Sequence, residues 1–161
     1  MRIIILNTFL LIALLFYKQS YSQDVIPQKE CINDSFLPQI DSIKRVMLEK
    51  GYTTVREASL NMESEYEAPV IAPLTQGAWY YFIFIGDVTS RLYEVRMYDA
   101  NDKQVVYKRN QWAEIDGNII GYAFIPQFTE LHMVKPVQVN KKKKKNLCGY
   151  IMILKRLPPV E

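Results

Sequence analysis

The only histidine of the chain, His132, is the first residue to consider for acid–base or metal chemistry. It stands in a strand-like run beside Met133 and Val134, with no cysteine near it in the sequence. Triad catalysis needs a histidine that a carboxylate orients beside a nucleophile, and no serine here lies in a Gly-x-Ser-x-Gly turn. A zinc site needs more ligands than one histidine and two distant cysteines supply. We therefore predict no catalytic residue, no metal site and no cofactor.

Two groups of polar residues offer other chemistry. Glu63, Glu65 and Glu67 stand two residues apart, and paired carboxylates perform catalysis in glycosidases. Carboxylates at this spacing share one side of an extended segment, which favours the solvent face of a strand. The stretch Asp99-Ala100-Asn101-Asp102 carries oxygens suited to calcium, but it lacks the glycine and the terminal glutamate of an EF-hand loop. A plain hairpin turn is the prediction for this stretch.

Five consecutive lysines, Lys141, Lys142, Lys143, Lys144 and Lys145, form the most unusual surface feature of the sequence. Such a run attracts acidic polysaccharide, lipid headgroups or nucleic acid, and salt weakens the attraction. Lysines in a loop between strands also stay hydrated and discourage edge pairing without binding a ligand. No aromatic residues are interleaved to stack on bases, so we expect no nucleic-acid partner. The run is a candidate polyanion contact, with a solvated loop as the alternative.

Trp112, with Tyr107 and Tyr122 as neighbours, is the candidate for an exposed aromatic platform. A flat ring on a β-sandwich can hold a sugar or anchor a protein partner. A core aromatic, or a lid over the core, is the alternative for the same residues.

The first 22 residues have the pattern of a secretory signal peptide. Arg2 gives a positive start, Ile3–Phe16 is apolar apart from Asn7-Thr8, and Ser20 and Ser22 supply the small residues before a cleavage site. We predict cleavage after residue 22 and export to the periplasm, the cell surface or the medium. An uncleaved anchor is the alternative, although the apolar run is shorter than the ~20 residues that span a bilayer. No transmembrane segment is expected after cleavage.

The remaining 139 residues suffice for one domain with its own core. The signal holds two of the 20 basic residues and none of the 17 acidic ones, so the mature chain is close to neutral at +1. This balance gives no general case for nucleic-acid binding. We expect a flexible mature N-terminus at residues 23–33, a single domain at 34–157 and a tail at 158–161.

Cys31 and Cys148 are the only cysteines and lie near the two ends of the mature chain. In an exported protein a lone pair is most simply a disulfide, which would close a loop of roughly a hundred residues. Two separate buried thiols are the alternative.

Hydrophobic periodicity predicts one helix and about eight strands. A helix beginning at Asp34 or Ser35 carries an apolar stripe that we expect to pack on its own domain rather than on a membrane or partner. The stretch Trp79–Ile85 is apolar or aromatic throughout, which predicts a central strand covered on both faces. Asp116-Gly117 predicts a hairpin turn, and Pro136 predicts an edge or bulged strand. The stripe is Phe36, Ile40, Ile43 and Met47, and the strands are 53–61, 68–74, 79–85, 92–98, 104–108, 119–125, 131–139 and 147–154.

This succession predicts a mainly β fold, an antiparallel jelly-roll-like β-sandwich with one N-terminal amphipathic helix. A βαβ protein would need a helix between successive strands, and the sequence shows none there.

Three stretches of the second half resemble the bacterial pre-peptidase C-terminal-type β-sandwich: Leu74–Phe82, Tyr93–Asp99, and Phe124-Ile125-Pro126 followed by Thr129-Glu130-Leu131. The resemblance covers roughly residues 74–154 and implies a non-catalytic accessory or binding module of a secreted protein. The Thr-Gly-x-Tyr step of that family is absent, since Glu130 stands where the glycine would be. The overall layout is also similar to small exported proteins of the Bacteroidota.

Together these observations predict an exported, non-catalytic β-sandwich module with a binding or structural role in the cell envelope or outside the cell. A glycan or another envelope protein is the expected kind of partner. A small secreted hydrolase with an unrecognised site, and a polyanion binder that uses the lysine loop, are the alternatives.

Overall fold

The computed structural model describes residues 31, 36–110 and 113–158 of the 161-residue chain. The predicted signal peptide, most of the predicted flexible segment, Trp112 and the last residues of the predicted tail lie outside these ranges. Export by a cleaved signal therefore stays a prediction. No helix of the described ranges is both long and apolar enough to cross a bilayer.

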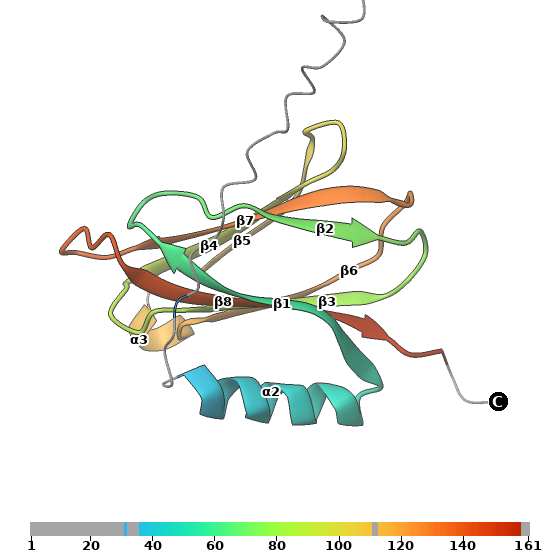
Figure 1. Cartoon of the computed structure of the whole chain (residues 1–161), viewed down its shortest axis with the longest axis horizontal. Helices are drawn as coiled ribbons and strands as arrows, with labels where there is room; N and C mark the ends of the chain where they lie inside the picture. The colour runs from blue at the N-terminus through green and yellow to red at the C-terminus, as the bar shows by residue number, and fades with distance from the viewer. Residues whose placement is uncertain (1–30, 32–35, 111–112, 159–161) are drawn as a thin grey trace, which may run out of the picture.

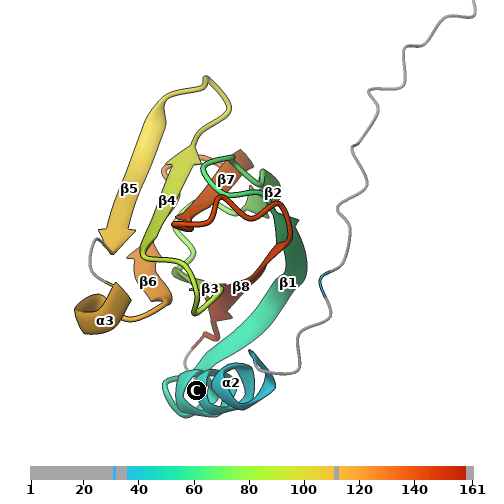
Figure 2. The ribbon, with the colours of Figure 1, turned by 90° about the vertical axis from the view of Figure 1, so that its left-hand side faces the viewer.

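Eight antiparallel strands form two four-stranded sheets that lie face to face (Figures 1 and 2). We term the two layers the helix-side sheet and the open sheet. The helix-side sheet has the order β1 (Tyr52–Met62), β8 (Leu147–Arg156), β3 (Tyr80–Gly86) and β6 (Ile119–Phe124). The open sheet has the order β2 (Val70–Leu74), β7 (Glu130–Val139), β4 (Leu92–Tyr98) and β5 (Gln104–Asn110).

The chain passes repeatedly from one sheet to the other, and this strand order is that of a jelly roll. Only β4 and β5 follow one another within a sheet, as the predicted hairpin. The predicted fold class, a mainly β antiparallel sandwich with a helix before its first strand, is confirmed.

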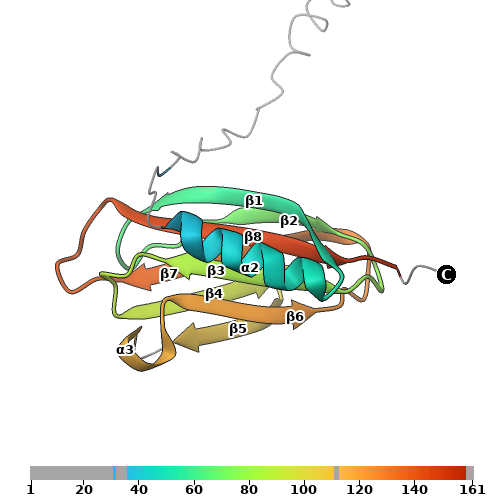
Figure 3. The ribbon, with the colours of Figure 1, turned by 90° about the horizontal axis from the view of Figure 1, so that it is seen from below.

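Helix α2 (Leu37–Glu49) lies along the outer face of the helix-side sheet (Figure 3). Residues of β3 alternate between the two layers that cover this strand. Phe82 and Phe84 point into the sandwich, whereas Ile83 and Ile85 pack against the helix. The prediction of a central strand covered on both faces is therefore confirmed for Tyr80–Ile85, but Trp79 lies before β3 and is 48 % exposed. The predicted helix stripe, Phe36, Ile40, Ile43 and Met47, packs on this sheet.

The predicted hairpin at Asp116-Gly117 is wrong. Asp116 ends a short helix, α3 (Ala113–Asp116), and the chain then crosses from β5 at the edge of one sheet to β6 at the edge of the other. The side-chain amide of Asn110 fixes this crossing, because it donates to the carbonyl oxygens of Asp116, Gly117 and Ile119 at 2.9–3.2 Å. Gly117 supplies the positive φ of 75° that the crossing requires.

The prediction that Pro136 marks an edge or bulged strand is also wrong, because β7 is a central strand between β2 and β4. The carbonyl of Pro136 accepts the N–H of Ala68 at 3.0 Å, before β2 begins. The nitrogen of Pro136 lies on the same side of the strand as its carbonyl. The missing donor thus faces the chain leading into β2, and no hydrogen bond to β4 is lost.

A disulfide joins Cys31 to Cys148, across 117 residues of sequence and a Cα–Cα distance of 5.5 Å. Cys148 lies at the start of β8, in the layer between the helix and its sheet. The bond therefore ties the segment before α2 to a central strand. The predicted pairing is present.

We expect reduction of this disulfide to lower the free energy of unfolding by about 4–5 kcal/mol, because the unfolded chain regains the entropy of a loop longer than a hundred residues. Urea unfolding with and without reductant measures the loss. The Cys31→Ser/Cys148→Ser variant is the control and should match the reduced protein with no further response to reductant. An unfolding midpoint that reductant leaves unchanged would contradict a structural role for the bond.

Candidate functional site

Three segments meet at one end of the sandwich: the β3–β4 loop (residues 87–91), the β7–β8 loop (140–146) and helix α3 (Figures 1 and 3). Figure 2 views this end directly. Between the segments opens a depression of about 930 Å³, which we term the basic hollow. Its lining residues are Val88, Thr89, Ser90, Arg91, Leu92, Tyr93, Arg109, Ile115, Gly117, Asn118, Val139, Asn140, Lys141, Lys142 and Lys144.

Two buried amides at the end of β7 hold these loops. The side-chain oxygen of Gln138 accepts the N–H of Asp87 at 2.9 Å, and its nitrogen donates to the carbonyl of Cys148 at 3.1 Å. The side-chain nitrogen of Asn140 donates to the carbonyl of Thr89 at 2.7 Å, and its oxygen accepts the N–H of Lys142 at 2.9 Å. Both amides are almost fully buried, so water does not replace these bonds. The two loops are thereby linked to each other and to the core.

Tyr93 fixes the other side of the β3–β4 loop. Its hydroxyl donates to the carbonyls of Asp87 and Ser90 at 2.7 and 2.9 Å. Burial, together with the nearby Asp87 carboxylate, raises the pKa of Tyr93 to about 12, so the hydroxyl stays protonated and continues to donate. The ring reaches this position only because Gly86 has no side chain, since a Cβ there would overlap the ring.

Positive charge dominates the basic hollow. Arg91, Arg109, Lys141, Lys142 and Lys144 line it, and none of its described lining residues is acidic. Apart from Arg109, these side chains form no ion pair with any carboxylate in the part of the chain that the structure describes.

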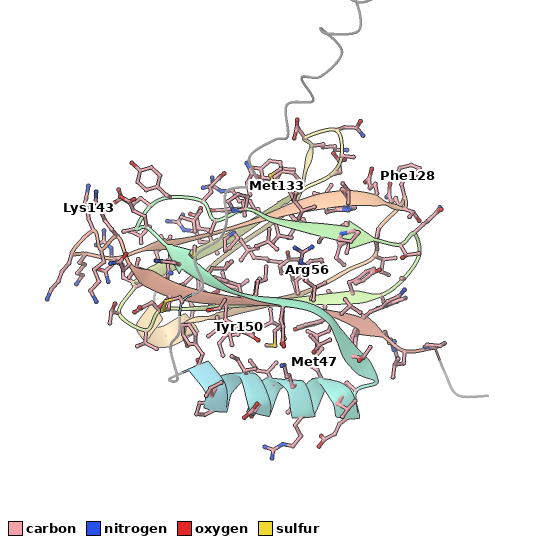
Figure 4. All side chains as sticks on the ribbon, in the orientation of Figure 1. Met47, Arg56, Phe128, Met133, Lys143 and Tyr150 are labelled. Atoms are coloured by element: carbon pink, nitrogen blue, oxygen red, sulfur yellow. A yellow bond between two sulfur atoms is a disulfide. The ribbon has the colours of Figure 1, made fainter. Side chains whose placement is uncertain are left out.

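The five lysines of the run do not act alike. The Nζ atom of Lys144 lies 3.3 Å from the Thr89 hydroxyl across the hollow. Lys143 has a positive φ of 47° and projects from the end of the sandwich, where its Nζ atom lies 3.6 Å from a Glu65 carboxylate oxygen (Figure 4). Lys143 and Lys145 do not line the hollow, whereas Lys141, Lys142 and Lys144 do. The structure therefore divides the predicted polyanion contact into two groups.

Arg109 connects the basic hollow to a charged network on the outer face of the open sheet. Its Nε atom lies 3.5 Å from Glu94, a carboxylate that also accepts hydrogen bonds from Arg96 at 2.6 Å and from Tyr107 at 3.1 Å. The hydrogen bond to Glu94 raises the pKa of Arg96. Glu67 then bridges Arg96 to the next strand, which leaves these carboxylates paired and away from the hollow.

The predicted aromatic platform is not assembled from the described residues. Tyr122 lies inside the sandwich, 5 % exposed, with its ring stacked on Phe82 at 5.1 Å. Tyr122 therefore cannot belong to an exposed platform, because alternation along β6 turns it inward with Ile120. Tyr107 is exposed, but its hydroxyl is held by Glu94. Trp112 lies outside the described residues.

His132 is buried in the sandwich with 2 % exposure. Its ring meets Phe124 edge-on at 5.4 Å, its Nε2 atom lies 3.6 Å from a Glu130 oxygen, and its Nδ1 atom has no hydrogen-bond partner among the described residues. A general base must reach the substrate, and this ring does not reach solvent.

The acidic groups are used within the fold. Glu63, Glu65 and Glu67 lie in the connection between β1 and β2 rather than along one strand face, and Glu67 pairs with Arg96 and Lys135. In the β4–β5 turn, one carboxylate oxygen of Asp99 accepts two backbone N–H groups at 2.9–3.0 Å. In the described part of the chain, no three histidine, cysteine, aspartate or glutamate side chains gather to hold a metal ion.

Sequence reasoning missed Arg91 and Arg109 as partners of the lysine run. Both lie far from the run in the sequence, and only the jelly-roll strand order brings their loops together. Asn140 had a local signal, since asparagine before a loop commonly bonds its own backbone.

Comparisons with known proteins give no family for this chain: no family model and no curated protein matches. The resemblance to pre-peptidase C-terminal domains therefore stays a prediction. Seventeen chains of solved structures match. One of them is AlgX of Pseudomonas aeruginosa, with a TM-score of 0.43 and 10% sequence identity. The match covers 65% of this chain and 27% of the AlgX chain.

Two further structures are similar at the same level. A structure described as CBM4 has a TM-score of 0.39 at 11% identity, over 66% of this chain and 79% of its own. The glycosylation-associated Gap123 complex of Streptococcus agalactiae has a TM-score of 0.35 at 10% identity. This match covers 69% of this chain and 43% of the other chain. Likenesses this distant carry no functional information, and the site rests on its own geometry.

We expect Gln138→Met to lower the free energy of unfolding by about 1–3 kcal/mol, because the Asp87 N–H and the Cys148 carbonyl lose their buried partner. Urea unfolding measures the loss, and hydrogen exchange should quicken at the amides of residues 87–91. Gln127→Met is the matched control, because Gln127 is exposed. If both variants unfold at the same urea concentration, Gln138 does not hold the loops.

Proposed function

We propose that this protein is a non-catalytic binding module that is exported from the cell and holds anionic groups of an envelope component in the basic hollow. One observation carries the proposal: a depression of about 930 Å³ lined by five cationic side chains and by no described acidic one. A depression of this size can accept a ligand segment rather than a single ion.

The charges of the basic hollow are available to a ligand. Cations on protein surfaces usually lie among carboxylates, and the mature chain is expected to hold almost as many acidic as basic residues. The carboxylates Glu67 and Glu94 nevertheless pair on the open sheet, and Glu65 pairs with Lys143. An anion entering the hollow would meet Arg91, Lys141, Lys142 and Lys144 without displacing a carboxylate, which favours binding.

Two observations support export. The disulfide between Cys31 and Cys148 is the kind of bond that persists in oxidising compartments outside the cytosol. The leader-like residues 1–22 agree with this placement. In such a compartment the anionic polymers and surfaces at hand are those of the envelope, and the hollow has no exposed aromatic side chain among its described residues to stack on nucleic-acid bases.

The hydrolase alternative has less support. An enzyme built on the only histidine would need His132 at a solvent-accessible cleft, and His132 lies in the core. The acidic residues that could form a pair, Glu65 and Glu67, bind separate cations.

Retention on a heparin column tests the proposal with two charge-matched variants. Lys142→Ala/Lys144→Ala removes two charges that line the hollow, and Lys143→Ala/Lys145→Ala removes two that do not. We expect the first variant to bind about thirtyfold more weakly and to elute at clearly lower salt, because each of its two lost cations contributes about 1 kcal/mol near an anionic surface. The second variant should elute close to the unmodified protein.

Equal shifts for the two variants would contradict the proposal, since they would show that only net charge matters. Unfolding midpoints equal to that of the unmodified protein are the control, because all four lysines are exposed. A wild-type protein that passes through the column without retention would also contradict it.

A further inference from the structure

The two most exposed large apolar side chains of the described residues both lie on the rim of the basic hollow. Ile115 is 84 % exposed and Val88 is 68 % exposed, whereas no other large apolar side chain in these ranges exceeds 65 %. Both line the hollow together with the unpaired lysines and Arg91. Exposed aliphatic groups beside a concentrated positive charge form an amphiphilic surface, and such a surface points to a definite kind of partner.

Both side chains stand on backbone that is held in place. Val88 lies between Asp87 and Thr89, whose backbone groups are bound by Gln138 and Asn140. Ile115 precedes Asp116 in α3, and the side-chain nitrogen of Asn110 donates to the carbonyl oxygens of Asp116, Gly117 and Ile119. Both residues line the hollow, at the end of the sandwich where α3 and the two loops meet (Figures 1 and 3).

We propose that this end of the molecule docks on the surface of an anionic lipid bilayer, with Val88 and Ile115 entering the interface between headgroups and acyl chains. Lys141, Lys142, Lys144, Arg91 and Arg109 would contact the anionic headgroups around them. This proposal rests on the proposed function, because it names the anionic component that the hollow recognises.

The chemistry of the rim favours a bilayer over a polysaccharide. Sugars are held by flat aromatic rings, and the one aromatic residue in the described lining, Tyr93, has its ring fully buried. Aliphatic tips gain little from a hydrated glycan chain, but they gain when they leave water for the acyl boundary. Cationic side chains beside them add the electrostatic attraction of an anionic leaflet.

The charge pattern also gives the contact one orientation. Glu63, Glu65 and Glu67 lie in the β1–β2 connection, and Glu65 pairs with Lys143 on the side of the lysine loop that does not line the hollow. An anionic surface repels these carboxylates and attracts the hollow, where the five lining cations outnumber the neighbouring Asp87 and Asp116. The hollow side, which carries Val88 and Ile115, therefore faces the membrane.

Sedimentation with lipid vesicles tests the proposal. The oxidised protein without its predicted leader, residues 23–161, is mixed with vesicles of phosphatidylcholine alone or of phosphatidylcholine with phosphatidylglycerol. We expect binding only to the vesicles that contain phosphatidylglycerol, weakened by salt. Val88→Ser/Ile115→Ser should lower the partition coefficient about tenfold, because both aliphatic groups then stay in water. The matched control is Leu48→Ser/Phe128→Ser, which removes two large side chains that are each 64 % exposed elsewhere on the surface and should bind like the unmodified protein.

The heparin column separates this proposal from the proposed function. Heparin retention that depends on Lys142 and Lys144, combined with no binding to anionic vesicles, would overturn membrane docking and leave the proposed function standing. Equal vesicle binding by the two serine variants, or equal binding to vesicles with and without phosphatidylglycerol, would also overturn it.

Discussion

The central strands β3 and β8 carry apolar side chains on both faces, and the remaining elements are arranged to keep those faces from water. Phe82 and Phe84 point toward the open sheet, while Ile83, Ile85 and Met152 point toward α2. Burial of such side chains contributes about 1.5–3 kcal/mol each, so neither cover can be removed without a large loss. The open sheet and the helix are therefore both needed, because each buries one face of these strands. The outer face of the open sheet has no helix over it among the described residues and exposes Ile71 and Leu131 as well as charged side chains.

The same core determines how the loops are presented. The last residues of β7 lie at the boundary between the core and the loop end, and there Gln138 and Asn140 replace apolar packing with hydrogen bonds to loop backbone. Loops held in this way lose less conformational entropy when a ligand binds. The lysine side chains are exposed, and the backbone that carries them is held by hydrogen bonds within the loop. Several exposed cations on a hydrogen-bonded loop suit an extended anionic surface better than a single small anion.

Periodicity in the sequence accounts for most of the fold and for little of the site. The unbroken apolar run of β3 and the four-residue stripe of α2 predict correctly because burial is a local property of each pattern. The alternation of Ile120 and Tyr122 could likewise have placed Tyr122 inside, and its reading as a surface ring overlooked that signal. Pro136 misled because a proline excludes a central position only when its nitrogen faces a neighbouring strand. The sequence alone could not identify Arg109 as a partner of the lysine run, since its place beside the lysines depends on the strand order.

The distribution of charge, rather than its total, distinguishes the loop end. Acidic and basic residues are nearly equal in number, so composition alone gives no reason to expect an anionic partner. On the open sheet, however, Glu94 binds Arg96 and Arg109, and Glu67 binds Arg96 and Lys135, which removes carboxylates from any other role. At the adjoining end, Arg91, Lys141, Lys142 and Lys144 form no ion pair with a described carboxylate, and the Asp87 carboxylate there is bound by Thr89. Because Val88 and Ile115 are exposed at that same end, attraction and insertion act at one place, and each strengthens the effect of the other.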